Sequence, residues 1–244
     1  MVSKSQIKLI TSLAQKKYRR RQGLFVVEGL KSIREFIAAN FVVQNLYTTR
    51  ETFNVVSNKI QQVNEEELKK ISFLKTPQKA LAVFKIPEVK KIESAQFYLA
   101  LDGVRDPGNL GTIIRLCDWF GLPGLVCSED TVDCFNPKVV QASMGSLARI
   151  NVLYTGLAKH LETSRLPVFG AFMDGENVYN SELPEQGILV MGNEANGISE
   201  EITPLITRKI SIPRFGETQE TESLNVATAS AILISEFKRA GFTH

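Results

Sequence analysis

The sequence contains few residues of the two types that most often bind metals. Its 244 residues include three cysteines, Cys117, Cys127 and Cys134, and two histidines, His160 and His244. Three scattered cysteines fit neither a disulfide framework nor the Cys-x-x-Cys spacing of zinc sites. We therefore expect no metal site and no catalytic triad built on histidine.

Long hydrophobic runs are also missing. No stretch of roughly 18 apolar residues occurs, so we expect no membrane-spanning helix. The first ten residues, MVSKSQIKLI, lack the apolar core and small-residue cleavage site of a secretory signal. Neither G-x-G-x-x-G nor G-x-x-x-x-G-K-[ST] occurs, which argues against a Rossmann dinucleotide site and a Walker phosphate loop. These absences predict a cytoplasmic protein without a membrane partner.

The net charge is only +3, yet the positive charge is concentrated near the N-terminus. Residues 1–31 hold eight Lys and Arg residues against the single acid Glu28, a net charge of +7 that leaves −4 for the remainder. This asymmetry predicts that the N-terminal region meets a polyanion. The densest part comprises Lys16, Lys17, Tyr18, Arg19, Arg20 and Arg21. Cations around an aromatic ring suit phosphate contact and base stacking, although in an arbitrary protein a solvated basic face is the commoner explanation.

The apolar pattern predicts an N-terminal α/β domain over residues 1–88. Helices are expected at 5–15 (capped by Ser3 or Ser5), at 30–39 and around 65–70, and strands at 25–27, 41–48 and 80–84. The stretch 86–94 (IPEVKKIES) is polar and contains a proline, so we place a linker at 89–96.

From residue 97 onward the alternation of strands and helices becomes cleaner, which predicts a second α/β domain over 97–244. Strands are expected at 97–101, 124–127, 149–153, 168–171, 188–191 and 209–212, and helices at 110–120, 137–147, 157–162 and 223–239. Continuously apolar strands such as Ile188–Met191 are typical of parallel sheets that are covered on both faces.

Three segments follow predicted strands, and in open α/β sheets ligands bind at the carboxyl ends of the strands. The first runs from Asp102 to Arg115. Its Asp-Pro-Gly turn leads to Asn109, which we expect at the N-cap of a helix, and Arg115 lies six residues further on. Taken alone, the segment fits a capped helix with a surface arginine equally well.

The second segment contains Gly192, Glu194 and Gly197 directly after a buried strand. Glycines at such a position let the backbone approach a ligand closely. Taken alone, a turn with Glu194 in the first turn of a helix is the better explanation.

The third segment joins Ile212-Pro213 and Gly216 to Ser223-Leu224-Asn225. We expect Ser223 to cap the long final helix and Asn225 to lie in its first turn, with its amide directed back to the loop.

Together the three segments resemble the SpoU-type (TrmH-type) RNA 2′-O-ribose methyltransferases of the SPOUT superfamily. The family's motifs occur in order: N-x-G-x-x-x-R as Asn109, Gly111 and Arg115; G-x-E-x-x-G as Gly192, Glu194 and Gly197; and I-P with S-L-N-V-A as Ile212-Pro213 and Ser223–Ala227. Residues 139–146 (VVQASMGS) also resemble the segment between the first two motifs. Each motif is weak alone, but three in order over about 120 residues are specific.

The N-terminal part resembles the family's substrate-binding domain, an α/β fold like that of RNA-binding ribosomal proteins. The similar residues are Lys17-Tyr18-Arg19, Gly23, and Phe25 to Gly29. One departure is the loop after Pro213, which looks about three residues longer than is usual in the family. It contains Glu217, Glu220 and Glu222, so the shape of the cofactor or RNA entrance cannot be transferred from the family.

The resemblance implies a trefoil knot in a C-terminal parallel-sheet domain. It also implies binding of S-adenosylmethionine, lined by Gly192, Ile212 and Leu224, and a homodimer whose active site is shared between subunits. Arg115 matches the arginine proposed to activate the ribose hydroxyl. Because the pKa of arginine exceeds about 12, we favour a cation that binds phosphate and lowers the pKa of the hydroxyl over a general base.

The other residues of the implied catalytic set are Asn109, Glu194, Ser223 and Asn225. The two asparagines offer neutral donors and acceptors near the ribose, and Ser223 is expected to contact substrate. We expect Glu194 to fix the loops by accepting backbone N–H groups, or to counter the charge of Arg115.

The resemblance leaves the substrate open. A dedicated N-terminal domain favours ribosomal RNA over transfer RNA, by analogy only. A non-catalytic RNA-binding or assembly factor on the same fold is the main alternative from another class, and the intact set of site residues argues against it. A base-nitrogen methyltransferase would ordinarily use a carboxylate base near the nucleobase, whereas the asparagine–arginine first motif favours ribose.

Overall fold

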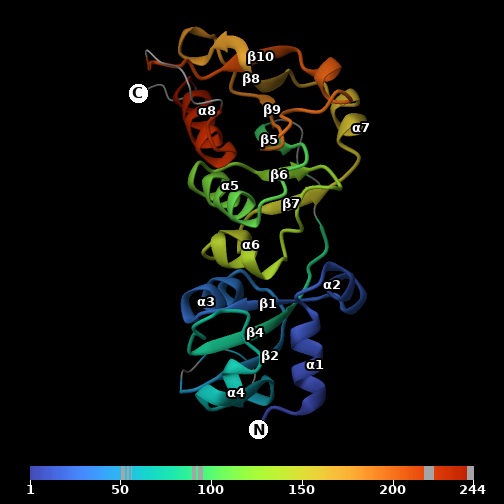
Figure 1. The fold of residues 1–244 in the computed structure, drawn as a ribbon, viewed down its shortest axis with the longest axis vertical. Helices are drawn as coiled ribbons and strands as arrows, with labels where there is room; N and C mark the ends of the chain where they lie inside the picture. The colour runs from blue at the N-terminus through green and yellow to red at the C-terminus, as the bar shows by residue number, and fades with distance from the viewer. Residues whose placement is uncertain are drawn as a thin grey trace. The chain divides into compact units, whose positions relative to one another are not determined.

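The computed structural model describes residues 1–50, 53, 55, 57–89, 92, 96–216 and 223–240. The chain forms two compact units, shown in Figure 1. The first unit comprises Met1–Glu88 and Asp133–Arg149, and the second comprises Val89–Val132 and Ile150–His244. The predicted domains, 1–88 and 97–244, are each one continuous segment, and these bounds stay a prediction. The compact first unit also includes 133–149, a segment that we had assigned to the second domain.

The first unit is built on a mixed four-stranded sheet with the order β1-β4-β2-β3. Its elements are α1 (Lys4–Ser12), α2 (Lys16–Gln22), β1 (Leu24–Glu28), α3 (Leu30–Ala38), β2 (Val43–Thr48), β3 (Ile60–Gln62), α4 (Glu65–Lys69), β4 (Ala80–Lys85) and α6 (Pro137–Ala142), with short 3₁₀ turns η1 (Ser57–Lys59) and η2 (Ser146–Ala148). Strand β4 runs antiparallel to β1 and β2, and β3 runs parallel to β2. The predicted N-terminal α/β domain is confirmed.

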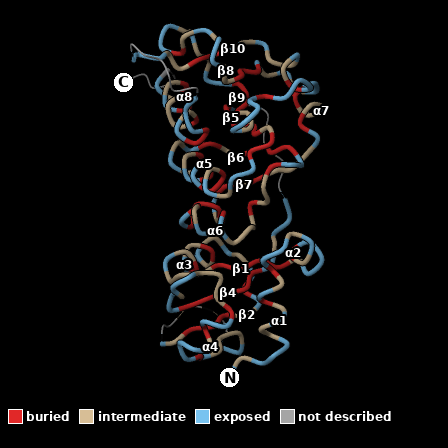
Figure 2. The backbone as a smooth tube through the Cα atoms, viewed as in Figure 1, coloured by how far each residue is buried: buried red, intermediate tan, exposed pale blue. Residues whose placement is uncertain are grey.

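The sheet of the first unit has a buried cluster on each face. Successive side chains of a strand point to opposite faces, so Val26 of β1 packs with Ile10, Tyr47 and Leu68 on one face. On the other face Phe25 contacts four further phenylalanines, Phe36, Phe41, Phe84 and Phe135. Figure 2 shows buried residues along these strands. Phe135 belongs to the 133–149 segment, so this segment completes the core of the first unit.

The basic run, for which the sequence predicted no secondary structure, forms the short helix α2. It ends at Gly23, whose φ of +63° is a left-handed conformation that glycine adopts without strain. Arg19 of this helix is only 1% exposed. Apolar periodicity cannot reveal α2, since its buried side is provided by an arginine.

The second unit contains a parallel six-stranded sheet with the order β10-β8-β9-β5-β6-β7. Its elements are β5 (Phe97–Leu101), α5 (Pro107–Trp119), β6 (Gly124–Cys127), β7 (Asn151–Tyr154), α7 (Leu157–Glu162), β8 (Val168–Asn177), η3 (Val178–Asn180), β9 (Gly187–Met191), η4 (Thr203–Leu205), β10 (Arg208–Ser211) and α8 (Val226–Ala240). Every residue of β5 and β9 is buried. The predicted parallel sheet is confirmed, whereas the trefoil knot stays a prediction.

The predicted helix at 137–147 is too long, because α6 ends at Ala142. Met144 has φ +52° and Gly145 has φ +97°, so the chain leaves the right-handed helical region there. A Cβ on Gly145 would lie 2.9 Å from Cγ of Glu35, which explains why glycine is required at this turn.

Helix α8 runs opposite to the strands of the second unit. Phe237, near its C-terminus, stacks on Phe97 with ring centroids 4.5 Å apart and meets Phe169 edge-on at 5.0 Å. Because Phe97 and Phe169 stand at the amino ends of β5 and β8, the N-terminus of α8 lies at the carboxyl ends of the sheet. The last motif therefore joins the other two at one edge.

The described residues contain neither a membrane-spanning helix nor a cluster of metal-binding side chains. Within the residues that the structure describes, no helix is both long and apolar enough to cross a membrane. The same ranges contain no group of three or more His, Cys, Asp and Glu side chains arranged to hold a metal ion.

Candidate active site

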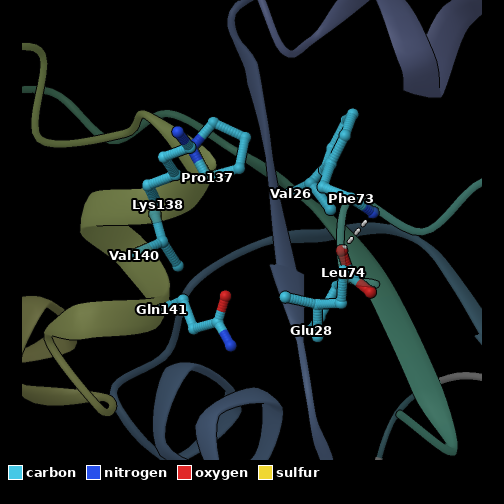
Figure 3. A pocket seen from close by; sticks show the side chains of 8 residues that line it. All are labelled: Val26, Glu28, Phe73, Leu74, Pro137, Lys138, Val140 and Gln141. Carbon is cyan, nitrogen blue, oxygen red and sulfur yellow. Dashed lines mark hydrogen bonds between the residues drawn. The ribbon is translucent and has the colours of Figure 1, made fainter. Parts of the chain in front are cut away.

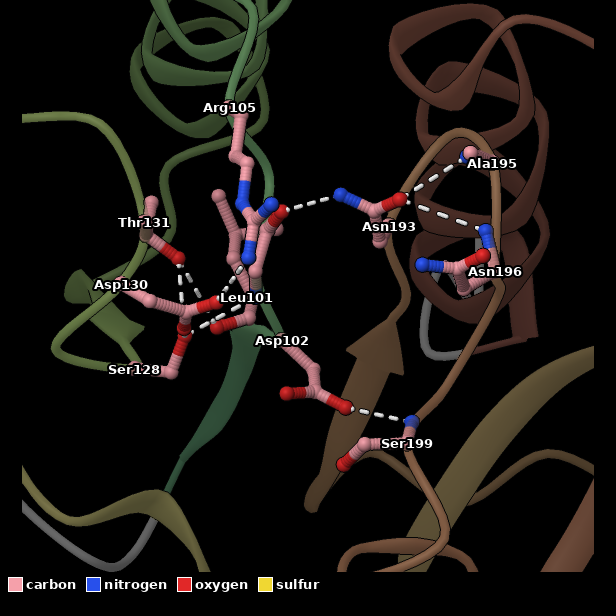
Figure 4. Close-up of polar contacts among 11 residues, drawn as sticks. Leu101, Asp102, Arg105, Ser128, Asp130, Thr131, Asn193, Ala195, Asn196 and Ser199 are labelled. Carbon is pink, nitrogen blue, oxygen red and sulfur yellow. Dashed lines mark hydrogen bonds and ion pairs between the residues drawn. The ribbon is translucent and has the colours of Figure 1, made fainter.

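Polar side chains join the loops that leave β5, β6 and β9 (Figure 4). Ser128, after β6, accepts from the amide of Gly103 at 2.9 Å and donates to Asp130 at 2.6 Å. Asn193, after β9, donates from its side chain to the carbonyl oxygen of Gly103 at 2.6 Å. The N–H and the carbonyl group of Gly103 are thus both hydrogen-bonded to neighbouring loops, which fixes the start of the first motif.

A second link ties the β5 loop to the segment after the second motif. Asp102 Oδ2 accepts from the backbone N–H of Ser199 at 2.7 Å. Arg105 and Asp130 form an exposed ion pair at 3.2 Å, which also joins the β5 and β6 loops (Figure 4). Together these contacts make the carboxyl edge of the sheet a connected scaffold.

The turn of the second motif closes on itself. The backbone groups of Asn193 and Gly197 bond reciprocally at 2.8 and 2.9 Å, and Gly197 has φ +69°. A Cβ on Gly192 would lie 2.2 Å from the carbonyl carbon of Gly197. We had interpreted Gly192 as leaving room for a ligand, but the close approach in this structure is that of the chain's own backbone.

Three of the predicted catalytic residues form one chain of hydrogen bonds. Asn225 Nδ2 donates to Asn109 Oδ1 at 2.9 Å, and Asn109 Nδ2 donates to Glu194 Oε1 at 2.9 Å. Asn225 Oδ1 accepts from the backbone N–H groups of Ala227 and Thr228, at 3.0 and 3.2 Å.

The chemistry of the three side chains determines which atom donates and which accepts in each of these hydrogen bonds. Because Asn225 Oδ1 already accepts from backbone, its nitrogen must face Asn109. Asn109 then accepts with its oxygen and donates with its nitrogen to Glu194, whose ionised carboxylate can only accept. The structure thereby brings residues from all three motifs together.

The predicted cap of the first helix is confirmed at Ser3, whereas the caps predicted for α5 and α8 are each wrong by a few residues. Asp106, not Asn109, caps α5: its side chain accepts from the amide of Asn109 at 2.8 Å, and Pro107 takes the first helical position. Asn225, not Ser223, caps α8, which begins at Val226. Asn109 and Ser223 are therefore released from capping, and Asn109 is free to bridge the other two motifs.

Glu194 does not act as we had expected. Among the residues that the structure describes, it accepts from the Asn109 side chain and from no backbone N–H group. It does not counter Arg115 either, because the exposed Arg115 side chain makes no hydrogen bond or ion pair within the described parts of the chain. The structure brings together Asn109, Glu194 and Asn225, whereas Arg115 and Ser223 stay outside their hydrogen-bond chain.

The residues expected to hold the cofactor follow β9 and β10 at the same edge. Ile212 is half-buried directly after β10, and Leu224 is 47% exposed. Phe215, which we had not selected, is 83% exposed and lies 6.4 Å from the ring of Tyr179. Exposed apolar side chains at the carboxyl edge suit contact with the flat faces of the adenine ring of S-adenosylmethionine. Glu217, Glu220 and Glu222 lie outside the described residues.

The basic residues predicted to bind RNA divide into two groups. Lys17, Arg20 and Arg21 are exposed on α2, and the Lys17 ammonium lies 4.9 Å from the ring centre of half-buried Tyr18. Lys16 is also half-buried. Arg19 is buried and donates from Nε and Nη2 to Asp133 at 2.9 and 2.5 Å. A guanidinium occupied in this way is structural, so we remove Arg19 from the RNA-binding set.

Several residues that build this edge are not among the predicted site residues. Asp102, Ser128, Asp130 and Asn193 hold the strand-end loops, and none was selected as a site residue. Asn193 carried a usable signal: asparagine after a strand and a glycine favours a turn stabilised by its own side chain. Its Oδ1 accepts from the amides of Ala195 and Asn196. Ser128 had no comparable signal, because its partner Gly103 is distant in sequence.

Two family profiles match the chain. The profile of the SpoU rRNA Methylase family matches residues 96–235, and that of the MRM3-like substrate binding domain matches residues 4–82. The chain is 32% identical over 231 residues to the 23S rRNA (guanosine(2553)-2′-O)-methyltransferase RlmP of Bacillus subtilis, which covers 91% of each protein.

Solved structures of similar sequence share the whole fold. A protein of Porphyromonas gingivalis, assigned to the TrmH family of RNA methyltransferases, has 41% identity and a TM-score of 0.89 over 98% of this chain and 99% of its own. The AdoMet-bound rRNA methyltransferase of Sinorhizobium meliloti has 26% identity and a TM-score of 0.86 over 100% and 98%. Since the first profile spans more than half of the sequence, this protein belongs to the SpoU rRNA Methylase family.

Proposed function

We propose that this protein transfers a methyl group from S-adenosylmethionine to a ribose 2′-hydroxyl of ribosomal RNA. The observation that carries the proposal is the hydrogen-bond chain Glu194–Asn109–Asn225, which unites the three motifs at the carboxyl edge of the parallel sheet. Family membership supports the reaction class. The B. subtilis relative, named for guanosine 2′-O-methylation of 23S rRNA, supports the acceptor atom and the type of RNA.

The cofactor would be held by the loops after β9 and β10. The backbone around Gly192 and the side chains of Ile212 and Leu224 would contact it, with Phe215 near the adenine. When bound, S-adenosylmethionine supplies an electrophilic methyl group on a sulfonium. The residues of the chain must then align a ribose 2′-oxygen with that methyl group and accommodate the proton that the oxygen loses.

Arg115 would bind an RNA phosphate beside the reacting ribose. Its side chain is exposed and, within the described residues, engages no acid, so its guanidinium can form a bidentate pair with phosphate. The positive charge favours the developing alkoxide and so lowers the pKa of the 2′-hydroxyl. Arginine would need an extreme environment to act as a base, so we assign it a positioning and electrostatic role.

Asn109 would orient the ribose from a position fixed on both sides. Its oxygen is taken by Asn225, and one N–H is taken by Glu194, which leaves one amide N–H for the substrate. Glu194 and Asn225 act through Asn109 as positioning residues. The exposed Ser223, released from capping, would contact the RNA.

The first unit would bind the RNA through Lys16, Lys17, Tyr18, Arg20 and Arg21. The three exposed cations on α2 supply phosphate contacts, and Tyr18 supplies a ring that a base can stack on. This assignment agrees with the match of residues 4–82 to a substrate-binding domain.

We further propose a homodimer, a knotted second unit and a cytoplasmic location. The single tryptophan, Trp119, ends α5 and is 84% exposed, which is unusual for a residue of its size. A second subunit that covers α5 would bury it. Sedimentation tests the homodimer: we expect a dimer for wild type and a monomer for Trp119→Glu. A wild-type monomer at assay concentration would overturn the proposed dimer.

The reaction is tested by incubating the protein with labelled S-adenosylmethionine and total RNA from a strain that lacks the gene. Digestion and identification of the labelled nucleoside then report the acceptor atom. We expect a 2′-O-methylnucleoside from wild type and from Arg165→Ala, and loss of label with Arg115→Ala. Arg165 is the matched control, since it is an exposed arginine of the same unit.

The same assay separates the alternatives. Mapping the label to transfer RNA would replace the ribosomal substrate but keep the chemistry. Label on a base would contradict the ribose assignment. No label in any RNA, together with no cofactor binding by calorimetry, would leave a non-catalytic RNA-binding protein.

A further inference from the structure

A pocket in the first unit lies between β1 and α6 (Figure 3). Its volume of about 30 Å³ is enough for roughly two water molecules. It is lined by Val26, Glu28, Phe73, Leu74, Pro137, Lys138, Val140 and Gln141. The walls are mostly apolar, and a few polar groups converge on the space, which is the usual composition of a small ligand site.

Glu28 supplies the acceptor of this pocket. It ends β1, where Oε2 accepts from Ser72 Oγ at 2.5 Å and Oε1 accepts from the amide of Phe73 at 2.7 Å. An ionised carboxylate has about four lone-pair positions, so two remain for a ligand. Burial raises the pKa of Glu28 above its ordinary value of 4.5, while the Ser72 and Phe73 hydrogen bonds oppose that shift. Further N–H donors from a ligand would favour the ionised form.

The opposite wall carries donors. Gln141 is exposed on α6 and directs its amide across the pocket toward Glu28, while the side chain of exposed Lys138 ends beside Pro137 (Figure 3). Helix α6 is held in place at both ends of its segment: Arg19 binds Asp133, and Arg149 forms an ion pair with Glu35. The pocket is therefore a fixed feature of the first unit.

The arrangement of acceptor and donors selects among the bases of RNA. The Watson–Crick edge of guanine presents two adjacent N–H donors, N1 and N2, next to the O6 acceptor. Adenine, cytosine and uracil do not offer two adjacent donors on that edge. A carboxylate across the pocket from an amide matches the guanine edge, because the carboxylate can accept both N–H groups while Gln141 donates to O6.

The size of the pocket fits the edge of a base rather than a whole ring. Two N–H groups would take the places of about two waters. The rest of the ring would lie against the apolar wall, which includes Phe73 and Pro137. An edge that enters in this way must come from a base that is not already paired.

We propose that this pocket binds the Watson–Crick edge of an unpaired guanine in the RNA substrate, with Glu28 as its acceptor. The proposal rests on the proposed function for the nature of the ligand. RNA is favoured because the same unit carries the exposed cations Lys17, Arg20 and Arg21, which provide the charge that RNA requires. The pocket is thus a base-recognition site added to a phosphate-binding surface.

The test compares oligonucleotides that differ by one amino group. The probes are fluorescein-labelled ten-nucleotide oligoadenylates with one central guanosine, or with inosine, which lacks the N2 amino group. We expect full-length wild type to bind the guanosine probe about 10-fold more tightly than the inosine probe, and Glu28→Gln to lose this preference. The substituted side chain keeps an amide oxygen that can accept from the Phe73 amide, so the fold is expected to tolerate the change.

Glu66→Gln is the matched control, since Glu66 is an exposed acid of α4 in the same unit. It removes the same charge and should retain the guanosine preference. Lys138→Ala combined with Gln141→Ala should weaken binding of the guanosine probe without altering thermal unfolding by more than a few degrees. Equal affinity of wild type for both probes, or an undiminished preference in Glu28→Gln, would overturn the proposal.

Methyl transfer distinguishes this proposal from the proposed function. Glu28→Gln is expected to raise KM for RNA about 10-fold and to leave kcat unchanged, because the hydrogen-bonded catalytic residues belong to the other unit. A preserved guanosine preference in a protein that transfers no methyl group to any RNA would refute the proposed function alone. Active enzyme with no preference would refute the pocket alone.

Discussion

Arg19 and Asp133 are 114 positions apart in the sequence, and their side chains form a buried ion pair in which Arg19 Nε and Nη2 donate to Asp133 Oδ2 at 2.9 and 2.5 Å. The third guanidinium nitrogen, Nη1, donates to the carbonyl oxygens of Leu13 and Ala14 at 2.8 and 2.9 Å. Arg19 therefore joins α2, the end of the preceding helical turn and the start of the 133–149 segment.

This arrangement predicts that Arg19 contributes to stability and not to RNA affinity. Arg19→Ala leaves the Asp133 carboxylate and two carbonyl groups without their donor, and removing one partner of a buried pair costs about 3–5 kcal/mol. Urea unfolding should show this decrease. Arg20→Ala, an exposed neighbour on the same helix, should change the free energy of unfolding by less than about 0.5 kcal/mol. Equal stability of the two variants would contradict the prediction.

The exposed cations of α2 predict the opposite behaviour. Arg20→Glu with Arg21→Glu should weaken RNA binding and reduce the slope of log affinity against log salt by about one for each phosphate that the protein no longer neutralises. The free energy of unfolding should stay near that of wild type. Lys69→Glu with Lys70→Glu, at the end of α4 in the same unit, makes the same change of charge and should leave the slope unchanged. Filter binding over a range of salt concentrations measures the RNA affinity and its salt slope for both double variants.

Asn225 has two separable roles, which predicts different outcomes for two substitutions. Serine caps helices nearly as well as asparagine but lacks the amide that reaches Asn109. The free energy of unfolding of Asn225→Ser should therefore lie within about 0.5 kcal/mol of the wild-type value. Its kcat should fall at least about 10-fold. Asn225→Ala should lose the same activity and, in addition, about 1 kcal/mol of stability. Wild-type kcat in Asn225→Ser would show that the link to Asn109 has no function.

The residues of this network illustrate what the sequence predicted and what it did not. Asn109, Glu194 and Asn225 were selected from the order of three motifs, and their proximity follows from the parallel sheet. Their hydrogen bonds were not predicted, because they depend on which residue caps each helix, and the caps lie at Asp106 and Asn225 rather than at Asn109 and Ser223. Pro107 was the overlooked signal in one case, since proline favours the first helical position and so indicated Asp106. In the other case the choice depends on a partner 116 positions away.

The 133–149 segment and α2 could not be predicted for a related reason. Apolar periodicity identifies helices that bury hydrophobic faces, whereas α2 buries Arg19. Likewise, Phe135 and Asp133 follow β6 in the sequence but pack with Phe25 and Arg19, which lie more than 100 positions earlier. Fully buried strands were located well, because such a strand is visible as a continuous apolar run. The short strand β3 (Ile60–Gln62) was missed, because none of its residues is buried.

Gly192 is predicted to be intolerant of any side chain. A methyl group there would overlap the Gly197–Ile198 backbone, so Gly192→Ala must open the turn of the second motif. We expect a decrease of more than about 2 kcal/mol in unfolding free energy and a weaker affinity for S-adenosylmethionine by calorimetry. Gly216→Ala is the control for stability, because a Cβ on Gly216 would meet no atom of the described residues within 4 Å. An alanine at 192 that leaves both quantities unchanged would exclude the tight turn.

Glu28 predicts a dependence of stability on pH. Burial raises the pKa of its carboxyl group in the folded chain above the ordinary value of 4.5, so the folded state holds this proton to a higher pH than the unfolded state does. The contribution of Glu28 to stability is therefore fully present below pH 4.5 and is lost as the pH rises through the raised pKa. A glutamine at this position does not titrate. The unfolding free energy of Glu28→Gln, relative to wild type, should thus increase across this window and become constant above it. Glu66→Gln should show no such trend, and a difference that is flat between about pH 4 and 7 would mean that Glu28 is not desolvated in the folded protein.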